Sequence, residues 1–329
     1  MSTTTIEWTD RVWNPVTGCD RTSPGCDHCY ALTMAKRLKA MGSAHYQTDG
    51  NETTSGPGFG VQCHEDALDI PMKWRKPSRV FVNSMSDLFH PAVYDSFIAA
   101  AWATMALTPQ HTYQVLTKRP KRMATLLNDR GVYRDDVNEW ADGLYVNGDV
   151  YGDVTGFSSG FRNWLPTHLA YADLLLPNVW LGTSIENDRY TFRADHLRAT
   201  PAAVRFLSLE PLLGPLPSLD LTGIDWVIVG GESGPGARPM HPDWVRDIRD
   251  RCVNAGIPFH FKQRGAWTWT LDAAYFEPNF WLHPDGRFVR DDDPQLQEGE
   301  WQGMWNLGKK RTGRELDGRT WDEFPGGAS

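Results

Sequence analysis

The sequence predicts an α/β protein whose core is a partial or complete β/α barrel of the TIM type. Short runs rich in β-branched and aromatic residues alternate with helical patterns over most of the chain, and such alternation is typical of βαβ units. Several of these runs are almost continuously apolar, as expected for parallel strands that are buried on both faces. Polar side chains follow nearly every run, at the strand ends where the loops of a barrel converge.

The expected elements follow one another in a regular order after a first strand that leads to a cysteine-rich loop. The further strands cover residues 79–83, 112–117, 179–184, 204–209, 225–230 and 258–262. Helices are expected from about residue 32, over 94–107, over 120–127, from 189 and over 242–255. This repeat predicts a barrel over residues 1–265.

Two stretches depart from the repeat. Residues 129–177 are rich in glycine and lack helical periodicity, and we expect an insertion or lid there. Residues 266–329 are rich in tryptophan, contain WLHPDGRFV, which resembles a hairpin, and end in a basic segment. They are predicted to form a C-terminal appendage packed on the barrel.

Acidic, basic and amide side chains lie just past the carboxyl ends of the expected strands. They are Asp87, Lys118, Glu186, Glu210, Glu232, Lys262 and Gln263. In a β/α barrel all strand ends meet at one face, so these residues would surround one active site. A doubly wound sheet binds its ligands only near the switch point of its strand order, which suits fewer of them. The barrel is therefore the favoured architecture.

The composition is that of a globular protein of the cytoplasm. Of 329 residues, 40% are hydrophobic and 22% are charged, which excludes a disordered or fibrous chain. No apolar run is long enough to span a bilayer, and the N-terminus lacks the regions of a signal peptide, so no membrane partner is expected. The net charge of −8 argues against non-specific coating of nucleic acid but leaves room for a local basic site.

Three of the five cysteines, Cys19, Cys26 and Cys29, crowd into one loop with C-x6-C-x2-C spacing. Glycines and prolines around them indicate a tight turn that can direct three thiolates to one centre. Three ligands from one loop suit a [4Fe–4S] cluster in which one iron has no protein ligand. That iron can chelate the amino and carboxylate groups of S-adenosylmethionine, and an electron passed to the sulfonium releases a 5′-deoxyadenosyl radical. The loop therefore predicts radical chemistry with S-adenosylmethionine.

Structural zinc is the alternative for the same cysteines. Cys3His sites are common, and His28, Cys63 or His64 offers a fourth ligand. Two features favour the cluster. A helix follows the Cys-x-x-Cys pair in place of a second ligand pair at zinc-ribbon spacing, and the loop precedes a run of βα units.

Zinc at this loop would imply another function. One alternative is a hydrolase or nuclease barrel in which Asp87, Glu210 and Glu232 bind a catalytic divalent metal. The other is a non-catalytic, zinc-stabilised adaptor for a partner protein. An adaptor would not need charged residues at every strand end, so it ranks last.

The segments around these residues resemble a known family. They are NPVTGC, SPGCDHCYA, FVNSMSDLFH, VLTKRP, LGTSIEN, FLSLEPLLGP, WVIVGGESGPGARPM, FKQRG and the later GRELDGRTWDEFP. The chain resembles the phage-associated three-cysteine-motif family, whose members are often encoded beside three-Cys-motif partner proteins. That family is similar to radical S-adenosylmethionine barrels, although the usual first gap between cysteines there is three residues and here it is six. The resemblance implies a [4Fe–4S] cluster, S-adenosylmethionine and a three-Cys-motif partner protein.

The resemblance also implies which strand-end residues hold the cofactor. In such barrels the loop after the second strand contacts the methionyl amino group, and here that loop holds Asn83, Ser84 and Asp87. Ser184 and Glu186 lie where a ribose- or carboxylate-binding pair would lie.

The GGESG segment resembles the amino-binding motif of those barrels in its letters, but it follows a late strand. Its residues are therefore expected to line the adenosyl or substrate side of the site; they are Gly230, Gly231 and Glu232. Candidates for catalysis are Lys118, Glu210 and Lys262, with salt bridges among barrel-end residues as the alternative role.

The expected substrate is a nucleotide or a nucleic-acid base that is modified or repaired. Three observations favour it: the phage association, the 15 tryptophans available for stacking on a base, and basic segments at residues 73–79, 117–122 and 309–314. An electron donor is a further expected partner, because cleavage of S-adenosylmethionine is reductive.

Overall fold

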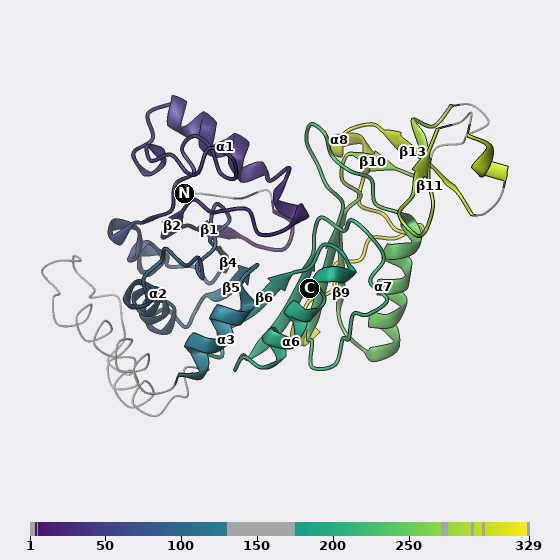
Figure 1. Ribbon diagram of the computed structural model, residues 1–329. Coiled ribbons are helices and arrows are strands. Elements are labelled where there is room, and N and C mark those ends of the chain that lie inside the picture. The colour runs from purple at the N-terminus through teal and green to yellow at the C-terminus, as the bar shows by residue number, and fades with distance from the viewer. Residues whose placement is uncertain are drawn as a thin grey trace, which may run out of the picture. The chain divides into compact units, whose positions relative to one another are not determined.

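The structure is a computed structural model that describes residues 4, 6–129, 175–270, 276–290, 293–297 and 300–327 (Figure 1). Within these ranges the main sheet has seven strands in the order β1-β4-β5-β6-β7-β8-β9. Their bounds are β1 (Arg11–Trp13), β4 (Arg79–Val82), β5 (Thr112–Thr117), β6 (Val179–Ser184), β7 (Val204–Leu209), β8 (Trp226–Gly230) and β9 (Phe259–Gln263).

The strand order follows the chain from β1 to β9 without a reversal. The neighbours β1 and β4, β4 and β5, β7 and β8, and β8 and β9 pair in parallel. A doubly wound sheet reverses its order at a switch point, whereas a β/α barrel does not. The fold is therefore α/β with a partial β/α barrel, and the fold class predicted from the sequence is confirmed.

The chain divides into two compact units. The first comprises residues 1–21, 31–182 and 196–204, and the second comprises residues 22–30, 183–195 and 205–329. Strands β1, β4 and β5 belong to the first unit, and β7, β8 and β9 belong to the second. The division at residue 265 expected from the sequence stays a prediction. The expected insertion near 129–177 lies almost entirely outside the described residues.

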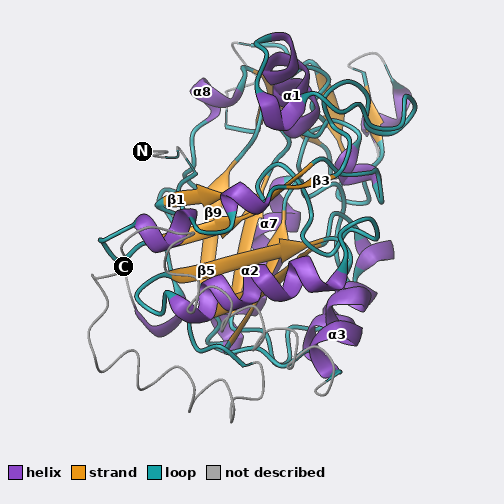
Figure 2. Cartoon of the chain, turned by 90° about the vertical axis from the view of Figure 1, so that its left-hand side faces the viewer, coloured by secondary structure: helices purple, strands orange, loops and turns teal. Residues whose placement is uncertain are grey.

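Helix α2 (Asp95–Leu107) supplies much of the core of the first unit. All of its residues from Phe97 onward are buried, and its many alanines let neighbouring elements approach closely. At its end, the Thr108 hydroxyl hydrogen-bonds the Tyr113 hydroxyl of β5. Figure 2 shows α2 in purple beside this strand.

The first unit also holds shorter elements around the sheet. They are β2 (Val16–Thr17), β3 (Gln62–Cys63), most of α1 (Tyr30–Ala40), α3 (Pro120–Asn128) and the 3-10 helices η2 (Ala44–Tyr46), η3 (Glu65–Ala67) and η4 (Ile70–Lys73). Strands β2 and β3 pair antiparallel, with Val16 opposite Cys63.

Helix α7 (Pro242–Ala255) in the second unit has the bounds that the sequence predicts, because its ends carry strong local signals. Pro242 occupies the first position, where a missing N–H is tolerated. The His241 ring accepts a hydrogen bond from the Asp243 amide (3.1 Å) and caps the helix. Gly256 ends it in the left-handed conformation with φ of 67°.

A second, antiparallel sheet lies in the C-terminal part of the chain, with the order β10-β13-β11-β12. Its strands are β10 (Trp267–Thr268), β11 (Phe280–Leu282), β12 (Phe288–Val289) and β13 (Gln302–Asn306). The pairing of Trp281 with Val289 confirms the predicted hairpin. Other short helices are η1 (Pro24–Cys26), η5 (Asp188–Tyr190), α6 (Phe192–Arg198), η6 (Pro294–Gln297), α8 (Lys309–Thr312) and η7 (Pro325–Gly327). In the described ranges, no helix has both the length and the apolar character that crossing a membrane requires.

Two histidines are buried in the second unit. His241 is 2% exposed and His260 of β9 is 1% exposed. Burial lowers the pKa of each ring from 6.5 to about 4. The His260 ring packs edge-on against Trp226 and Phe324, and among the described residues neither of its nitrogens has a hydrogen-bond partner. Both rings are therefore neutral at neutral pH.

We predict that the protein loses stability as the pH falls from 6.5 toward 4. The pKa of each histidine is lower in the folded chain than in the unfolded chain. The unfolded chain therefore binds more protons between pH 6.5 and pH 4. As a result, the free energy of unfolding that is present above pH 6.5 decreases as the pH falls to 4. The loss should be on the order of 3 kcal/mol for each ring. Urea unfolding at the two ends of this interval measures it. His260→Phe should remove about half of the loss, and an identical loss in this variant would contradict the assignment.

Candidate metal centre at the three cysteines

Cys19 follows a turn that requires glycine. Gly18 has φ of 81°, and a Cβ atom there would lie 2.1 Å from the Gly60 carbonyl oxygen. Its amide donates a hydrogen bond to the Met85 carbonyl (3.2 Å). A side chain at position 18 would therefore displace the backbone that leads from β2 into the cysteine loop.

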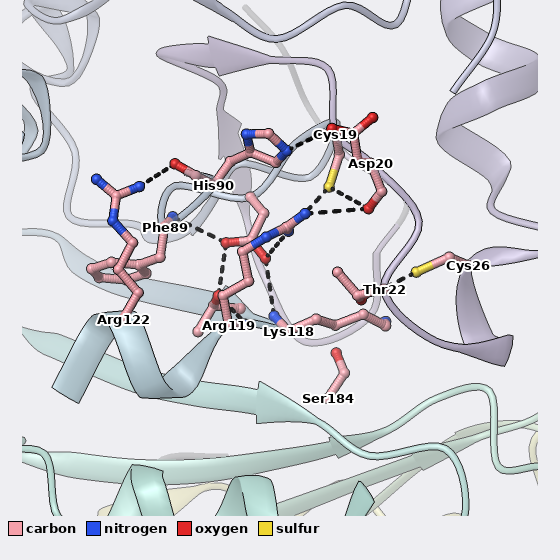
Figure 3. Close-up of polar contacts among 12 residues, drawn as sticks. Cys19, Asp20, Thr22, Cys26, Phe89, His90, Lys118, Arg119, Arg122 and Ser184 are labelled. Atoms are coloured by element: carbon pink, nitrogen blue, oxygen red, sulfur yellow. Dashed lines mark hydrogen bonds and ion pairs between the residues drawn. The ribbon is translucent and has the colours of Figure 1, made fainter. Parts of the chain in front are cut away.

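A guanidinium group contacts the Cys19 thiol (Figure 3). Arg119 Nη1 lies 3.4 Å from Cys19 Sγ and 2.9 Å from Asp87 Oδ2, and its Nη2 donates to the Asp20 carbonyl at 3.3 Å. The Arg119 and Asp87 side chains are 13% and 6% exposed. A largely buried ion pair thus holds both the thiol and the backbone of the loop.

The Asp87 carboxylate is surrounded by hydrogen-bond donors. Besides Arg119, it accepts from the Phe89 amide (3.0 Å), the Thr117 hydroxyl (2.7 Å) and the Lys118 amide (3.0 Å). Thr117 ends β5, and Asp87 lies in the loop after β4. The carboxylate therefore joins two neighbouring strand ends and fixes the direction of the Arg119 side chain.

Asp20, next to Cys19, is held by a second set of contacts. Its carboxylate accepts hydrogen bonds from the Ser55 hydroxyl and from His90 Nε2 (3.1 Å). The hydrogen bond from Ser55 lowers the pKa of Asp20; burial opposes this effect, and His90 adds to it. Burial lowers the pKa of His90.

Cys26 and Cys29 lie in residues 22–30 of the second unit. Cys26 ends the 3-10 helix η1, and its carbonyl accepts a hydrogen bond from the Cys29 amide (3.2 Å). The Thr22 hydroxyl lies 3.7 Å from Cys26 Sγ. Helix α1 begins at Tyr30, directly after Cys29, so the Cys-x-x-Cys turn leads straight into a helix.

Glu186 lies beneath this turn and is fully buried. It accepts hydrogen bonds from Arg193 Nη1 (3.0 Å) and from the Ser23 hydroxyl. Arg193 also donates to the carbonyl of Ser184, the last residue of β6 (2.8 Å). A Cβ atom at Gly25 would lie 2.4 Å from Glu186 Cγ, so glycine permits this close approach.

Glu232 forms a similar brace on another side of the turn. It accepts from Arg238 Nη2 (2.6 Å) and Nε (2.9 Å), and its Oε2 lies 3.0 Å from His28 Nδ1. Arg238 donates in turn to the Pro24 carbonyl (2.8 Å). Burial raises the pKa of Glu232, but the hydrogen bonds from Arg238 and His28 outweigh it, so that the pKa is lowered and the carboxylate is ionised at neutral pH.

Glu210, after β7, pairs with the end of β9. Lys262 Nζ lies 2.9 Å from its Oε2, and Gln263 Nε2 donates to its Oε1 at 3.0 Å. Burial raises the pKa of Glu210, but Lys262 and Gln263 outweigh it, and the pKa is lowered. A Cβ atom at Gly230 would lie 3.1 Å from the Glu210 carboxyl carbon, and one at Gly231 would lie 2.1 Å from the Arg264 carbonyl oxygen.

Asn83 differs from the other strand-end residues because neither atom of its side-chain amide has a partner among the described residues, although its backbone N–H donates to the Trp13 carbonyl (2.8 Å). The residue is 3% exposed and directly follows β4. Among the described residues, neither Oδ1 nor Nδ2 forms a hydrogen bond. Its φ of 61° is in the left-handed region, where residues other than glycine are uncommon. Ser84, next to it, donates to Asn14 Oδ1 at 3.3 Å.

The residues predicted from the sequence fall into both units. Those of the first unit are Cys19, Asn83, Ser84, Asp87 and Lys118; those of the second are Cys26, Cys29, Ser184, Glu186, Glu210, Gly230, Gly231, Glu232 and Lys262. Their roles in binding and catalysis stay predictions. The sequence did not predict the arginines that pair with the carboxylates, which are Arg119, Arg193 and Arg238. Arg119 and Arg238 lie within the VLTKRP and GGESGPGARPM segments, which was the available signal.

The fold is that of an α/β protein with a partial β/α barrel, and Cys19, Cys26 and Cys29 stay its predicted metal ligands. The chain belongs to the family described as a protein of unknown function, DUF5131, whose model matches residues 3–325. No curated protein matches it. The phage association and the three-Cys-motif partner stay predictions.

Solved structures of spore photoproduct lyase are similar to the chain at low identity. The lyase complexed with dinucleoside spore photoproduct is 13% identical, with a TM-score of 0.32, over 86% of this chain and 68% of that one. A cysteine-to-serine mutant is 13% identical, with a TM-score of 0.34, over 87% and 70%. A double mutant with bound AdoMet and dinucleoside spore photoproduct is 12% identical, with a TM-score of 0.32, over 87% and 70%.

We predict that Glu186→Gln destabilises the metal-free protein by about 3–5 kcal/mol, because it leaves the Arg193 guanidinium buried without a counter-charge. The side chain keeps its shape, so packing is preserved. Asp247→Asn is the matched control, since Asp247 pairs with Arg251 at 3.1 Å but is 56% exposed; its effect should be below about 1 kcal/mol. Urea unfolding of both variants measures the difference. Equal effects would show that the Glu186 pair is not an essential brace.

Proposed function

We propose that this protein is a radical S-adenosylmethionine enzyme whose [4Fe–4S] cluster is held by Cys19, Cys26 and Cys29. The observation that carries the proposal is the bracing of the cysteine loop. Arginines paired with buried carboxylates hold it: Arg119 with Asp87 contacts Cys19, and Arg193 with Glu186 and the partly exposed Arg238 with Glu232 hold the segment of Cys26 and Cys29. Buried ion pairs contribute little net stability, so their concentration on one loop supports a functional requirement for its shape.

The donors present fit such a cluster. Thiolates are its usual protein ligands, and three from one loop leave one iron open. When bound, the cluster supplies the electron that cleaves S-adenosylmethionine reductively to methionine and a 5′-deoxyadenosyl radical. Arg119 presents an N–H group to Cys19 Sγ, which offsets the negative charge of a ligating thiolate.

Asn83 is the residue that we assign to S-adenosylmethionine. Its buried amide offers a donor and an acceptor without a partner in the described chain, and such a group gains a full hydrogen bond when a polar ligand arrives. The amino and carboxylate groups of the methionyl part have the matching chemistry. Asp87, whose carboxylate already accepts four hydrogen bonds, acts as a positioning residue for Arg119.

The proposed substrate class is a nucleotide or a base in nucleic acid, with modification or repair as the reaction. Those of the 15 tryptophans that are not buried in the core offer stacking surfaces, and the three basic segments offer sites for phosphate on an otherwise acidic chain. Lys118, Glu210 and Lys262 remain our candidates for contact with substrate. An external electron donor is part of the proposal, as is a three-Cys-motif partner protein.

The first test is iron content. Protein reconstituted without oxygen should be brown and hold about four irons per chain. Replacing Cys19, Cys26 or Cys29 with Ala should abolish cluster binding, since each corner iron needs its thiolate. Cys63→Ala and Cys252→Ala are the controls and should retain iron, because burial raises the pKa of these thiols to about 11 and about 12 and keeps them protonated. Stoichiometric zinc without iron would favour the hydrolase instead.

The second test is cofactor cleavage. Reduced, reconstituted protein given S-adenosylmethionine should release 5′-deoxyadenosine and methionine slowly even without substrate. Asn83→Ala should weaken S-adenosylmethionine binding about ten- to a hundredfold, as expected for loss of a hydrogen bond to a charged group, while leaving iron content unchanged. Asn128→Ala, at the end of α3, is the control and should bind as wild type does. If 5′-deoxyadenosine does not appear, the proposal fails.

A further inference from the structure

Two histidines and an aspartate converge in the first unit. His45 lies in η2, His64 directly follows β3, and Asp66 lies in η3. One potential ligand atom from each residue lies within 4.8 Å of the other two. His45 Nε2 and Asp66 Oδ2 are 3.1 Å apart, and the two imidazole rings stack with centroids 3.9 Å apart.

We propose that His45, His64 and Asp66 form a binding site for a divalent transition-metal ion, with zinc as the expected occupant. Two imidazoles and one carboxylate are ligands that Zn²⁺ and Co²⁺ accept, and water completes a tetrahedron of three protein ligands. This site does not depend on the proposed radical chemistry, and it uses none of the cysteines.

Distances within the group suit a small ion. With metal–ligand bonds of about 2.0–2.1 Å, neighbouring ligand atoms of a tetrahedral zinc site are roughly 3.3 Å apart. The separation of His45 Nε2 and Asp66 Oδ2 is close to this value. The Asp66 side chain is 73% exposed, which leaves a path for the ion and room for its water. The His64 ring stacks on the His45 ring, so the two rings must swing apart before all three ligand atoms bind one ion.

Thr17 determines which nitrogen of His64 carries the proton. Its hydroxyl donates to the His45 carbonyl oxygen (3.0 Å) and lies 2.7 Å from His64 Nε2. Because a hydroxyl has a single proton, Thr17 must accept a hydrogen bond from Nε2–H. His64 Nδ1 then keeps its lone pair for a metal. Ligating histidines usually donate their other N–H in this way, which fixes the tautomer and the ring orientation.

His64 is also in the protonation state that binds metal. Burial lowers its pKa, and the neighbouring His45 lowers it further, so that the ring is neutral near pH 7. The ring is 8% exposed and therefore loses little freedom when it becomes a ligand.

A metal here would link two short helices to the antiparallel pair of β2 and β3, and β2 leads to Cys19. Thr17 ends β2, two residues before Cys19, and β2 pairs with β3, which His64 follows. The ion would thus restrain the strand from which the cysteine loop starts. Its expected effect is structural.

The experiment is a titration with Co²⁺ of full-length, chelator-treated protein in which Cys19, Cys26 and Cys29 are replaced with Ala, so that their thiols cannot bind the ion; it is followed by visible absorption. Ligand-field bands should appear without intense thiolate-to-cobalt charge transfer. His45→Ala and Asp66→Asn should each weaken this binding at least about tenfold. Thr17→Val, which removes the partner of His64 Nε2 and the hydrogen bond to the His45 carbonyl, should weaken it about ten- to a hundredfold. His283→Ala is the matched control: His283 pairs with Asp285 at 2.9 Å but belongs to no such three-residue group among the described residues, so binding should be unchanged.

Zinc should also raise the thermal unfolding temperature of the protein without these three cysteines and of its His283→Ala variant, but not that of its His45→Ala variant. Circular dichroism of the metal-free variants checks that each is folded. A cobalt spectrum dominated by thiolate charge transfer and insensitive to His45→Ala and Asp66→Asn would overturn the proposal, because the ion would then be held by cysteines.

Discussion

The cysteine loop depends on arginine side chains paired with buried carboxylates at strand ends. Desolvating two charges costs several kcal/mol, and their attraction offsets this only in good geometry. Such pairs therefore specify an arrangement more than they stabilise it. Each pair also contacts the loop itself. Arg119 contacts Cys19, and Arg238 donates a hydrogen bond to the Pro24 carbonyl. Glu186, the partner of Arg193, accepts a hydrogen bond from the Ser23 hydroxyl. The position of the loop is thus set by the ends of the strands.

Two kinds of polar residue lie at these strand ends, and they have opposite energetic character. Asp87, Glu186 and Glu232 are saturated with donors and act on the loop within the protein. Asn83 is buried, unsatisfied and in a left-handed conformation. An unsatisfied buried amide costs about 1–3 kcal/mol, and strained backbone persists only where its surroundings enforce it. That combination is typical of sites kept for a ligand.

The sequence predicted the parallel strands and α7 well, because continuous apolar runs, a leading proline and a closing glycine are local signals. It also placed polar residues at strand ends. It could not predict which of them pair, because the contacts join distant positions: Arg119 and Cys19 are 100 residues apart, and Arg238 and Pro24 are 214 apart. The short strands β10 and β13 gave no periodic signal, whereas the hairpin of β11 and β12 has a turn sequence that was recognisable.

Side chains and backbone of the protein contact each part of the cysteine loop. Gly18 and Gly25 fit against neighbouring groups, and the arginine–carboxylate pairs are electrically neutral whether or not the thiols are ionised. Zinc fingers behave differently, since they are unfolded until metal arrives. In this chain the contacts of Cys19 and those of the Cys26–Cys29 segment come from charged side chains that fold with each unit, so the loss of a metal would not remove them.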